Sequence, residues 1–194
     1  MPARNSPVRY GWVAQVLHWG IVVLLVIQVT LGKIADELPV GLERLVMMSR
    51  HKSFGITILG LAIIRLAWRW FDPPPLPTRM PRWQEVAARL NHWALYVLLF
   101  ALPLTGWLIS SAANRPVSWF GLVQLPDFVA PDEGLEEAFE AAHEFLVNTL
   151  FVLVGLHVAA ALKHQFVDRW RGSARMPPFT SHGEPVAIGQ GGER

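Results

Sequence analysis

Four long apolar stretches, separated by polar or proline-rich segments, dominate the pattern of hydrophobic and polar positions along the chain. They cover approximately residues 12–32, 51–70, 90–112 and 143–167. Each is close to the roughly 20 residues that an α-helix needs to cross a hydrocarbon core about 30 Å thick. Because a backbone in lipid must satisfy its own hydrogen bonds, each stretch is expected to be helical. The pattern therefore predicts an all-α, integral membrane four-helix bundle with an antiparallel up-down topology.

The distribution of lysine and arginine predicts how this bundle is oriented, because cytoplasmic segments carry an excess of both residues near the helix ends. With the N-terminus inside, the inside set (residues 4, 9, 65, 69, 79, 82, 89, 163, 169, 171 and 175) outnumbers the outside set (residues 33, 44, 50, 52 and 115). Both termini are therefore predicted to be cytoplasmic. Residues 1–175 form one predicted transmembrane domain, and the Gly- and Pro-containing residues 176–194 are expected to form a flexible cytoplasmic tail.

The composition supports a membrane protein and narrows its chemistry. Only 16% of the residues are charged, whereas soluble domains carry about 25%. The nine tryptophans suit membrane interfaces. The chain has no cysteine, which excludes disulfides, thiolate catalysis, iron–sulfur clusters, thiolate-ligated haem and covalent c-type haem attachment. A net charge of +2 gives little support to nucleic-acid binding.

The histidines are the strongest functional signal. Six of the seven lie in or at the ends of the apolar stretches: His18, His51, His92, His143, His157 and His164. An ionisable side chain inside a membrane is costly and usually marks a functional site. A single such histidine could simply hydrogen-bond a neighbouring helix. Six in one four-helix chain indicate a shared function.

The fourth apolar stretch places two histidines on one face at different depths. His143 and His157 are 14 residues apart, which corresponds to about 21 Å along a helix and nearly four full turns. They belong to a stripe with alternating spacings of four and three that is typical of a helix facing its bundle: His143, Val147, Leu150, Val154, His157, Ala161 and His164. This geometry suits two flat cofactors held at two depths of a membrane.

Matching depths predict two ligand pairs. His51 and His143 would lie near the outer face, and His18 and His157 nearer the inner face. Two b-type haems held in this way would have both axial positions of each iron filled by imidazole. With no open coordination position, electron transfer is the expected activity. Gly20, Gly55 and Gly155 lie close to these histidines and could admit a macrocycle or serve helix packing.

Four further residues are candidates for supporting functions. His92 and His164 lie closer to the predicted cytoplasmic face and are candidates for a quinone pocket. His92 is also an alternative second ligand of the inner haem. Arg65 lies within an apolar run, where it could pair with a haem propionate or extend to the interface. Lys52, next to His51, places positive charge where an anionic reductant would deliver electrons to the outer haem.

Taken together, these segments resemble the bacterial cytochrome b561 family. The similarity lies in RYGWVAQVLHWGIVVLL, RHKSFGITILGLAIIRLAWR, RLNHWALYVLLFALPLTGW and AHEFLVNTLFVLVGLHVAAALKHQF. The resemblance implies a four-helix, di-haem cytochrome of the bacterial inner membrane, with His18, His51, His143 and His157 as iron ligands. It also implies superoxide:ubiquinone oxidoreductase activity as the leading candidate, with membrane lipid, superoxide or another periplasmic donor, and ubiquinone as partners.

Two alternatives compete with this interpretation. The chain could be the membrane subunit that connects a dehydrogenase, a hydrogenase or a soluble cytochrome to quinone. It could instead be a transporter whose histidines bind zinc or copper. The distance between His143 and His157 is too great for both to hold one ion, which disfavours the transporter.

Overall fold

Four long helices account for nearly all of the regular structure. The computed structural model describes residues 2–7, 9–75, 81–166 and 176. Its elements, in chain order, are α1 (Trp12–Glu37), α2 (Leu42–Phe71), α3 (Arg82–Ala112), β1 (Ser118–Trp119), β2 (Val123–Gln124) and α4 (Glu133–Phe166). Of the predicted tail, residues 176–194, all but residue 176 lie outside the described residues.

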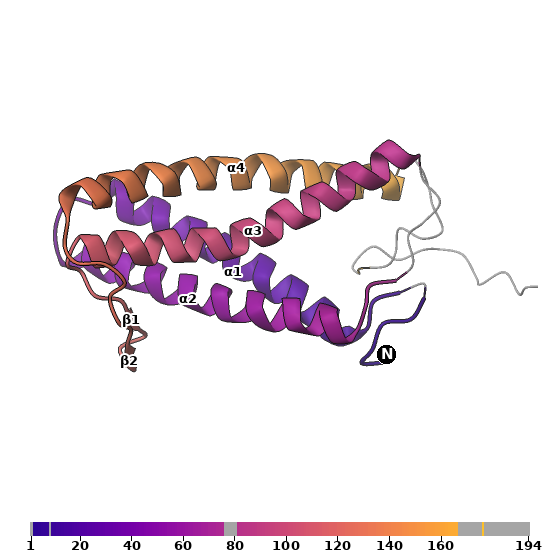
Figure 1. Ribbon diagram of the computed structural model, residues 1–194, viewed down its shortest axis with the longest axis horizontal. Helices are drawn as coiled ribbons and strands as arrows, with labels where there is room; N and C mark the ends of the chain where they lie inside the picture. Colours follow the sequence, from indigo (N-terminus) through magenta and orange to yellow (C-terminus); the bar gives the residue numbers. More distant parts are fainter. Residues whose placement is uncertain (1, 8, 76–80, 167–175, 177–194) are drawn as a thin grey trace, which may run out of the picture.

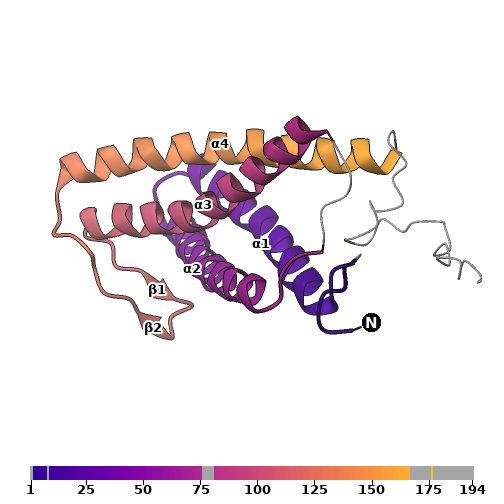
Figure 2. The same ribbon diagram turned by 45° about the vertical axis from the view of Figure 1, so that its right-hand side comes forward.

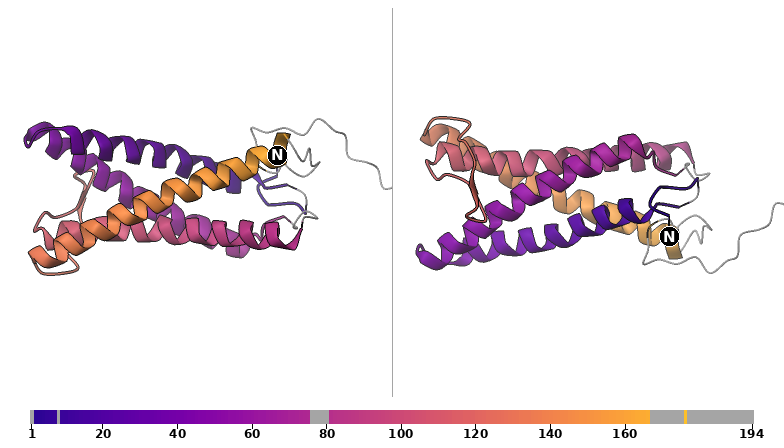
Figure 3. Two further views of the ribbon diagram at one scale, coloured as in Figure 1. Left: turned by 90° about the horizontal axis from the view of Figure 1, so that it is seen from above. Right: turned by 90° about the horizontal axis from the view of Figure 1, so that it is seen from below.

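The helices form an antiparallel up-down bundle (Figure 1). α2 packs against α1 and α3, and α4 packs against α3. No Cα atom of α1 lies within 8 Å of a Cα atom of α4. Figure 2 shows α1 and α2 running beside each other beneath α3 and α4, and Figure 3 shows α4 running obliquely across the other helices. The chain's N-terminus and the end of α4 lie at the same end of the bundle, here called the terminal end, and the opposite end is called the loop end.

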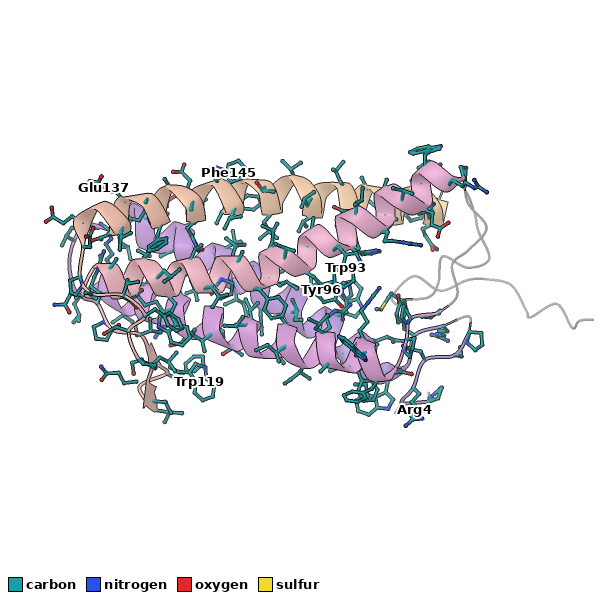
Figure 4. All side chains as sticks on the ribbon, viewed as in Figure 1. Arg4, Trp93, Tyr96, Trp119, Glu137 and Phe145 are labelled. Atoms are coloured by element: carbon teal, nitrogen blue, oxygen red, sulfur yellow. The ribbon has the colours of Figure 1, made fainter. Side chains whose placement is uncertain are left out.

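The surface of the bundle is apolar, as a lipid environment requires. All four helices are long and apolar enough to cross a membrane. Large apolar side chains such as Val26, Phe145 and Val152 are exposed, and Phe145, at 69% exposure, points away from the bundle in Figure 4. A soluble protein rarely exposes so much contiguous apolar surface. The prediction of an all-α, integral membrane four-helix bundle is therefore confirmed.

The helices are longer than the apolar stretches that predicted them. α4 starts at Glu133, ten residues before His143. Glu133 and Glu136 lie in its first turn, where carboxylates stabilise the positive end of the helix dipole. The side chain of Asp132 accepts a hydrogen bond from the backbone N–H of Leu135 at 2.9 Å and so caps the helix. The apolar stretches therefore predicted only the part of each helix that suits the lipid core, and the polar ends of the helices extend beyond it.

A small β-hairpin at the loop end has no counterpart among the predicted elements. β1 and β2 pair antiparallel, and Phe120 and Gly121 in the turn have positive φ angles. The hydroxyl of Ser53 on α2 accepts a hydrogen bond from the backbone N–H of Phe120 at 3.0 Å. The indole N–H of Trp119 donates to the hydroxyl of Thr57 at 3.1 Å. These bonds fix the hairpin against α2.

Candidate functional site

The terminal half of the bundle brings three histidines together from three helices. The ring centroids of His18 on α1 and His157 on α4 are 6.3 Å apart, with an angle of 66° between the ring planes. The ring of His92 on α3 lies 5.2 Å from that of His157. The ring of His157 therefore contacts both other rings. Either His18 or His92 is the candidate for the second ligand of a group that His157 would bind.

The centroid distances distinguish the two candidate partners. A metal–imidazole bond is about 2 Å long, and a ring nitrogen lies about 1 Å from its centroid, so imidazoles on opposite sides of one metal have centroids about 6 Å apart. The 6.3 Å between His18 and His157 agrees with this spacing, whereas the 5.2 Å between His92 and His157 is shorter. Across the described ranges, the ring nitrogens of His18 and His157 make no protein hydrogen bonds.

The loop half of the bundle contains His51 on α2 and His143 on α4, the two residues predicted to form the outer pair, and each ring is oriented by a hydrogen bond. Nδ1 of His51 lies 3.1 Å from the backbone carbonyl oxygen of Gln28. Nδ1 of His143 lies 2.9 Å from the hydroxyl oxygen of Thr105. Since the Thr105 hydroxyl can donate to the carbonyl of Ala101 at 2.9 Å, it can accept a hydrogen bond from His143.

These contacts favour the same tautomer in both loop-end rings. An imidazole that donates from Nδ1 keeps a lone pair on Nε2, the arrangement found in metal-binding histidines. Nε2 of His51 also lies 3.1 Å from the side-chain nitrogen of Gln28, an amide donor. His143 therefore keeps the Nε2 lone pair for an acceptor of electron pairs, such as a metal ion, whereas in His51 this lone pair faces the Gln28 amide, which a metal ion would have to displace.

The glycines near the histidines fall into two groups. A Cβ atom on Gly55 would lie 3.2 Å from the side-chain nitrogen of Gln28, and one on Gly32 would lie 3.2 Å from Cε1 of His51. These glycines permit close packing around the His51 ring. At Gly20 and Gly155, no atom lies within 4 Å of where a Cβ would stand. Each of these two glycines is two residues, or about 200° of helix rotation, from the nearby histidine, so the open space beside it lies on the opposite helix face from His18 or His157.

The donor set suits haem better than a bare metal ion. Two imidazoles from different helices are the axial ligands of many b-type haems, and the chain has no cysteine to supply a thiolate. Zinc sites usually use three or four protein ligands. No group of three or more His, Cys, Asp or Glu side chains that could hold a metal ion occurs within the described residues. This observation argues against the metal-transporter interpretation.

The structure places the two candidate cations at opposite ends of the bundle. Nη1 of Arg65 donates to the carbonyl oxygen of Ala14 at 3.1 Å, one turn before His18 on α1. Nζ of Lys52 donates to the backbone carbonyl of Arg115 at 3.0 Å, at the loop end. Each cation thus lies near the histidine pair with which the sequence associated it.

The two quinone candidates occupy the terminal end. His92 is an exposed residue of α3, and its ring contacts that of His157. His164 is half-buried near the end of α4 and follows His157 by about 10 Å along the helix. Their joint participation in one pocket stays a prediction.

Sequence reasoning missed Gln28 and Thr105, the residues that orient the loop-end rings. Gln28 had a usable signal, because an amide side chain in the middle of an apolar helix needs a partner. Thr105 had none, because a threonine hydroxyl can satisfy itself on its own helix, and Thr105 also lies 3.0 Å from the carbonyl of Leu102.

Comparison with known proteins identifies relatives along nearly the whole chain. A family model described as prokaryotic cytochrome b561 matches residues 9–178. Cytochrome b561 homolog 2 of Escherichia coli (strain K12) is 37% identical over 179 residues, which cover 87% of this chain and 91% of that protein. Cytochrome b561 homolog 1 of the same organism is 30% identical over 84% of this chain and 93% of that protein. A probable superoxide oxidase, CybB, of Yersinia pestis is 30% identical over 88% of this chain and 96% of that protein.

Proposed function

Since the chain belongs to the prokaryotic cytochrome b561 family, whose members are membrane electron-transfer proteins that bind b-type haem, we propose that it transfers electrons from superoxide to ubiquinone. The observation that carries this proposal is that α4 places His143 and His157 at two depths of the bundle, with the ring of His18 on α1 6.3 Å from that of His157. Two haems at different depths would connect one membrane face to the other.

The residues of the chain divide between the two proposed haems. His18 and His157 would hold the terminal-end haem, and His51 and His143 the loop-end haem. A bound haem would supply one-electron chemistry. The carbonyl of Gln28 and the hydroxyl of Thr105 orient the loop-end rings. The chain therefore contributes the orientation of the loop-end rings.

Quinone reduction requires two electrons and two protons, so a proton-carrying side chain is needed near the bound quinone. His92 and His164 are the proposed groups, because both lie in the terminal half of the bundle beyond the reach of the loop-end pair. In our proposal the terminal end faces the bacterial cytoplasm, which would then supply the protons. This orientation rests on the excess of lysine and arginine in the segments at that end.

Superoxide is the proposed electron donor at the loop end. Two superoxide ions would give up one electron each and become two molecules of oxygen, and the two electrons would reduce one ubiquinone to ubiquinol. The similarity to a probable superoxide oxidase supports this donor. Lys52 adds positive charge beside His51, where an anionic donor would approach.

An exposed acidic surface favours a second candidate donor. The side chains of Asp127, Asp132, Glu133, Glu137 and Glu140 are exposed at the loop end. Such a surface repels an anion and attracts a basic protein. The second candidate function is therefore electron transfer from a soluble cytochrome or a dehydrogenase or hydrogenase subunit to quinone.

Two measurements on the detergent-purified protein test these proposals. Oxidised and dithionite-reduced spectra, with a pyridine haemochrome assay, should give low-spin b haem at two per chain. Ubiquinol formation should then follow a pulse of superoxide and fail when superoxide dismutase is present. Two haems without superoxide-driven ubiquinol formation would exclude the superoxide reaction and leave the protein-donor candidate. A folded protein without haem would contradict both.

A further inference from the structure

The terminal end of the bundle contains a small pocket lined by hydrogen-bond donors. Its walls come from the segment before α1 and from α1, α2 and α3, and include Arg65, Trp68, Arg69 and Tyr96. Figure 4 shows Tyr96 pointing from α3 towards the α1–α2 side of the bundle. The pocket measures about 20 Å³, little more than the space of one water-sized sphere. It can accept one small polar group but not a quinone ring.

Arg65 brings a positive charge to this pocket without an acidic partner. Six residues separate it from Phe71 at the end of α2, so it lies about 9 Å inside the helix. Its described hydrogen bond is to a neutral carbonyl, that of Ala14. Within the residues that the structure describes, no carboxylate lies within 4 Å of Arg65. A cation at membrane depth is stabilised by an anion, and no carboxylate of the described residues forms an ion pair with Arg65.

Trp68 adds an unpaired donor to the same pocket. Its indole Nε1 is buried, and no acceptor for it is present among the described residues. A buried donor without a partner is destabilising, and most such groups in native proteins are hydrogen-bonded. Arg69 lies 5.8 Å from the ring centroid of Tyr96, which holds a second cation at the pocket wall.

One carboxylate, that of Asp72, also lines the pocket, but it already has a partner. Its Oδ2 accepts a hydrogen bond from the backbone N–H of Asn5 at 2.8 Å. The side chain of Asn5 in turn donates to the backbone carbonyls of Asp72 and Pro73, both at 3.0 Å. Asp72 thus ties the segment before α1 to the end of α2, and the donors of Arg65 and Trp68 are left for another acceptor.

We propose that this pocket binds an anionic oxygen group, a carboxylate or a phosphate, through Arg65, Arg69 and the indole N–H of Trp68. The carboxylate would be a propionate of the haem held by His18, which lies one helical turn from Ala14, and this source rests on the proposed function. The phosphate would be the headgroup of an anionic lipid at the same membrane face. In both cases, an anionic oxygen would accept hydrogen bonds from Arg65, Arg69 and Trp68.

The test compares two pocket variants with a matched control. Arg65→Gln removes the charge, and Trp68→Phe removes only the N–H donor while it keeps an aromatic ring in place. Arg89→Gln removes an arginine of α3 that pairs with Glu85 on an exposed surface, and serves as the control. Should Arg65→Gln fail to fold, Trp68→Phe and the charge-conserving Arg65→Lys still probe the pocket.

Two readouts separate the two sources. The first is a redox titration of each haem in lipid-free detergent, and the second is bound phosphorus per chain after exhaustive washing. With a propionate in the pocket, Arg65→Gln lowers the potential of one haem, because lost positive charge favours the oxidised form, and leaves phosphorus unchanged. Trp68→Phe lowers the same potential by less than Arg65→Gln does. The potential in Arg65→Lys stays close to that of the wild type, because the positive charge is kept.

With a lipid phosphate in the pocket, the wild-type protein retains about one phosphorus per chain, and both pocket variants lose it. The haem potentials of the wild type then differ between vesicles of phosphatidylglycerol and of phosphatidylcholine. If neither the potentials nor the phosphorus content of the pocket variants differs from those of Arg89→Gln, the proposal is wrong. If the purified protein contains no haem, a haem propionate cannot be the occupant of the pocket. The phosphorus assay would still test whether a lipid phosphate binds there.

Discussion

At the scale of single residues, the two histidine pairs differ in what orients their rings. His51 and His143 each have Nδ1 beside an oxygen acceptor, from Gln28 and Thr105 respectively. His18 and His157 have only ring contacts in the described structure. A hydrogen bond from the free ring nitrogen raises the basicity of a metal-bound histidine and fixes its orientation. The proposed loop-end haem is therefore the more firmly held of the two.

Thr105→Val tests this inference with nearly the same side-chain volume. Loss of the hydroxyl removes the acceptor of the His143 ring, and haem affinity at the loop-end site should fall by about ten- to a hundredfold. The measurement is haem occupancy during titration of the apoprotein, followed by absorption. Thr149→Val is the control, because the hydroxyl of Thr149 bonds only the carbonyl of Phe145 on its own helix. Equal affinities in the two variants would contradict the role of Thr105.

A second residue-scale prediction concerns the partner of His157. His18→Ala should reduce the haem content from two per chain to one, because the remaining ring at 5.2 Å does not match the spacing of trans ligands. His92→Ala should retain both haems and slow ubiquinone reduction. The pyridine haemochrome assay measures the first effect, and steady-state ubiquinol formation measures the second. The reverse pattern would identify His92 as the ligand.

At the scale of elements, α2 organises the loop end. Ser53 is 1% exposed and bonds both the backbone N–H of Phe120 and the carbonyl of Ser118. The sequence predicted the membrane-embedded part of each helix, because 20-residue apolar runs are specific to membrane spans. It did not predict the hairpin, since the partner of Ser118 is 65 positions away. The candidate histidines could be found from the sequence because they stand out within the apolar runs. The residues that orient their rings could not, because they lie on neighbouring helices and meet the histidines only in the folded bundle.

Ser53→Ala should release the hairpin without unfolding α2. The backbone N–H of Phe120 loses its acceptor in a part-buried setting, at a cost of about 1 kcal/mol for the lost hydrogen bond. Limited proteolysis should then cut residues 118–124 faster than in the wild type, and the melting temperature should fall by a few degrees. Thr30→Ala is a suitable control, because the hydroxyl of Thr30 bonds only the carbonyl of Val26 within α1. Unchanged cleavage would show that Ser53 does not hold the hairpin.

At the scale of the whole molecule, the even number of helices places the N-terminus and the end of α4 at one end of the bundle. The structure alone does not distinguish the two membrane faces, because helix packing is the same in either orientation. In our proposal, which rests on the lysine and arginine distribution, the loop end faces the periplasm.

The absence of cysteine allows a direct test of this orientation. Single-cysteine variants Arg4→Cys and Asp127→Cys report on the terminal end and the loop end respectively. A membrane-impermeant maleimide added to spheroplasts should label Asp127→Cys at once and label Arg4→Cys only after permeabilisation. The opposite result would reverse the proposed direction of electron flow. Labelling of both variants in intact spheroplasts would indicate leaky membranes and is checked with a cytoplasmic marker protein.

The position of α4 in the chain has a consequence for biogenesis. In the proposed assignment, α4 contributes one ligand to each pair, while the other ligands come from α1 and α2. A ribosome makes α4 last, so neither haem site is complete until the final helix has entered the membrane. Haem binding then requires all four helices to be in the membrane, and a chain truncated before α4 should lack both haems rather than one.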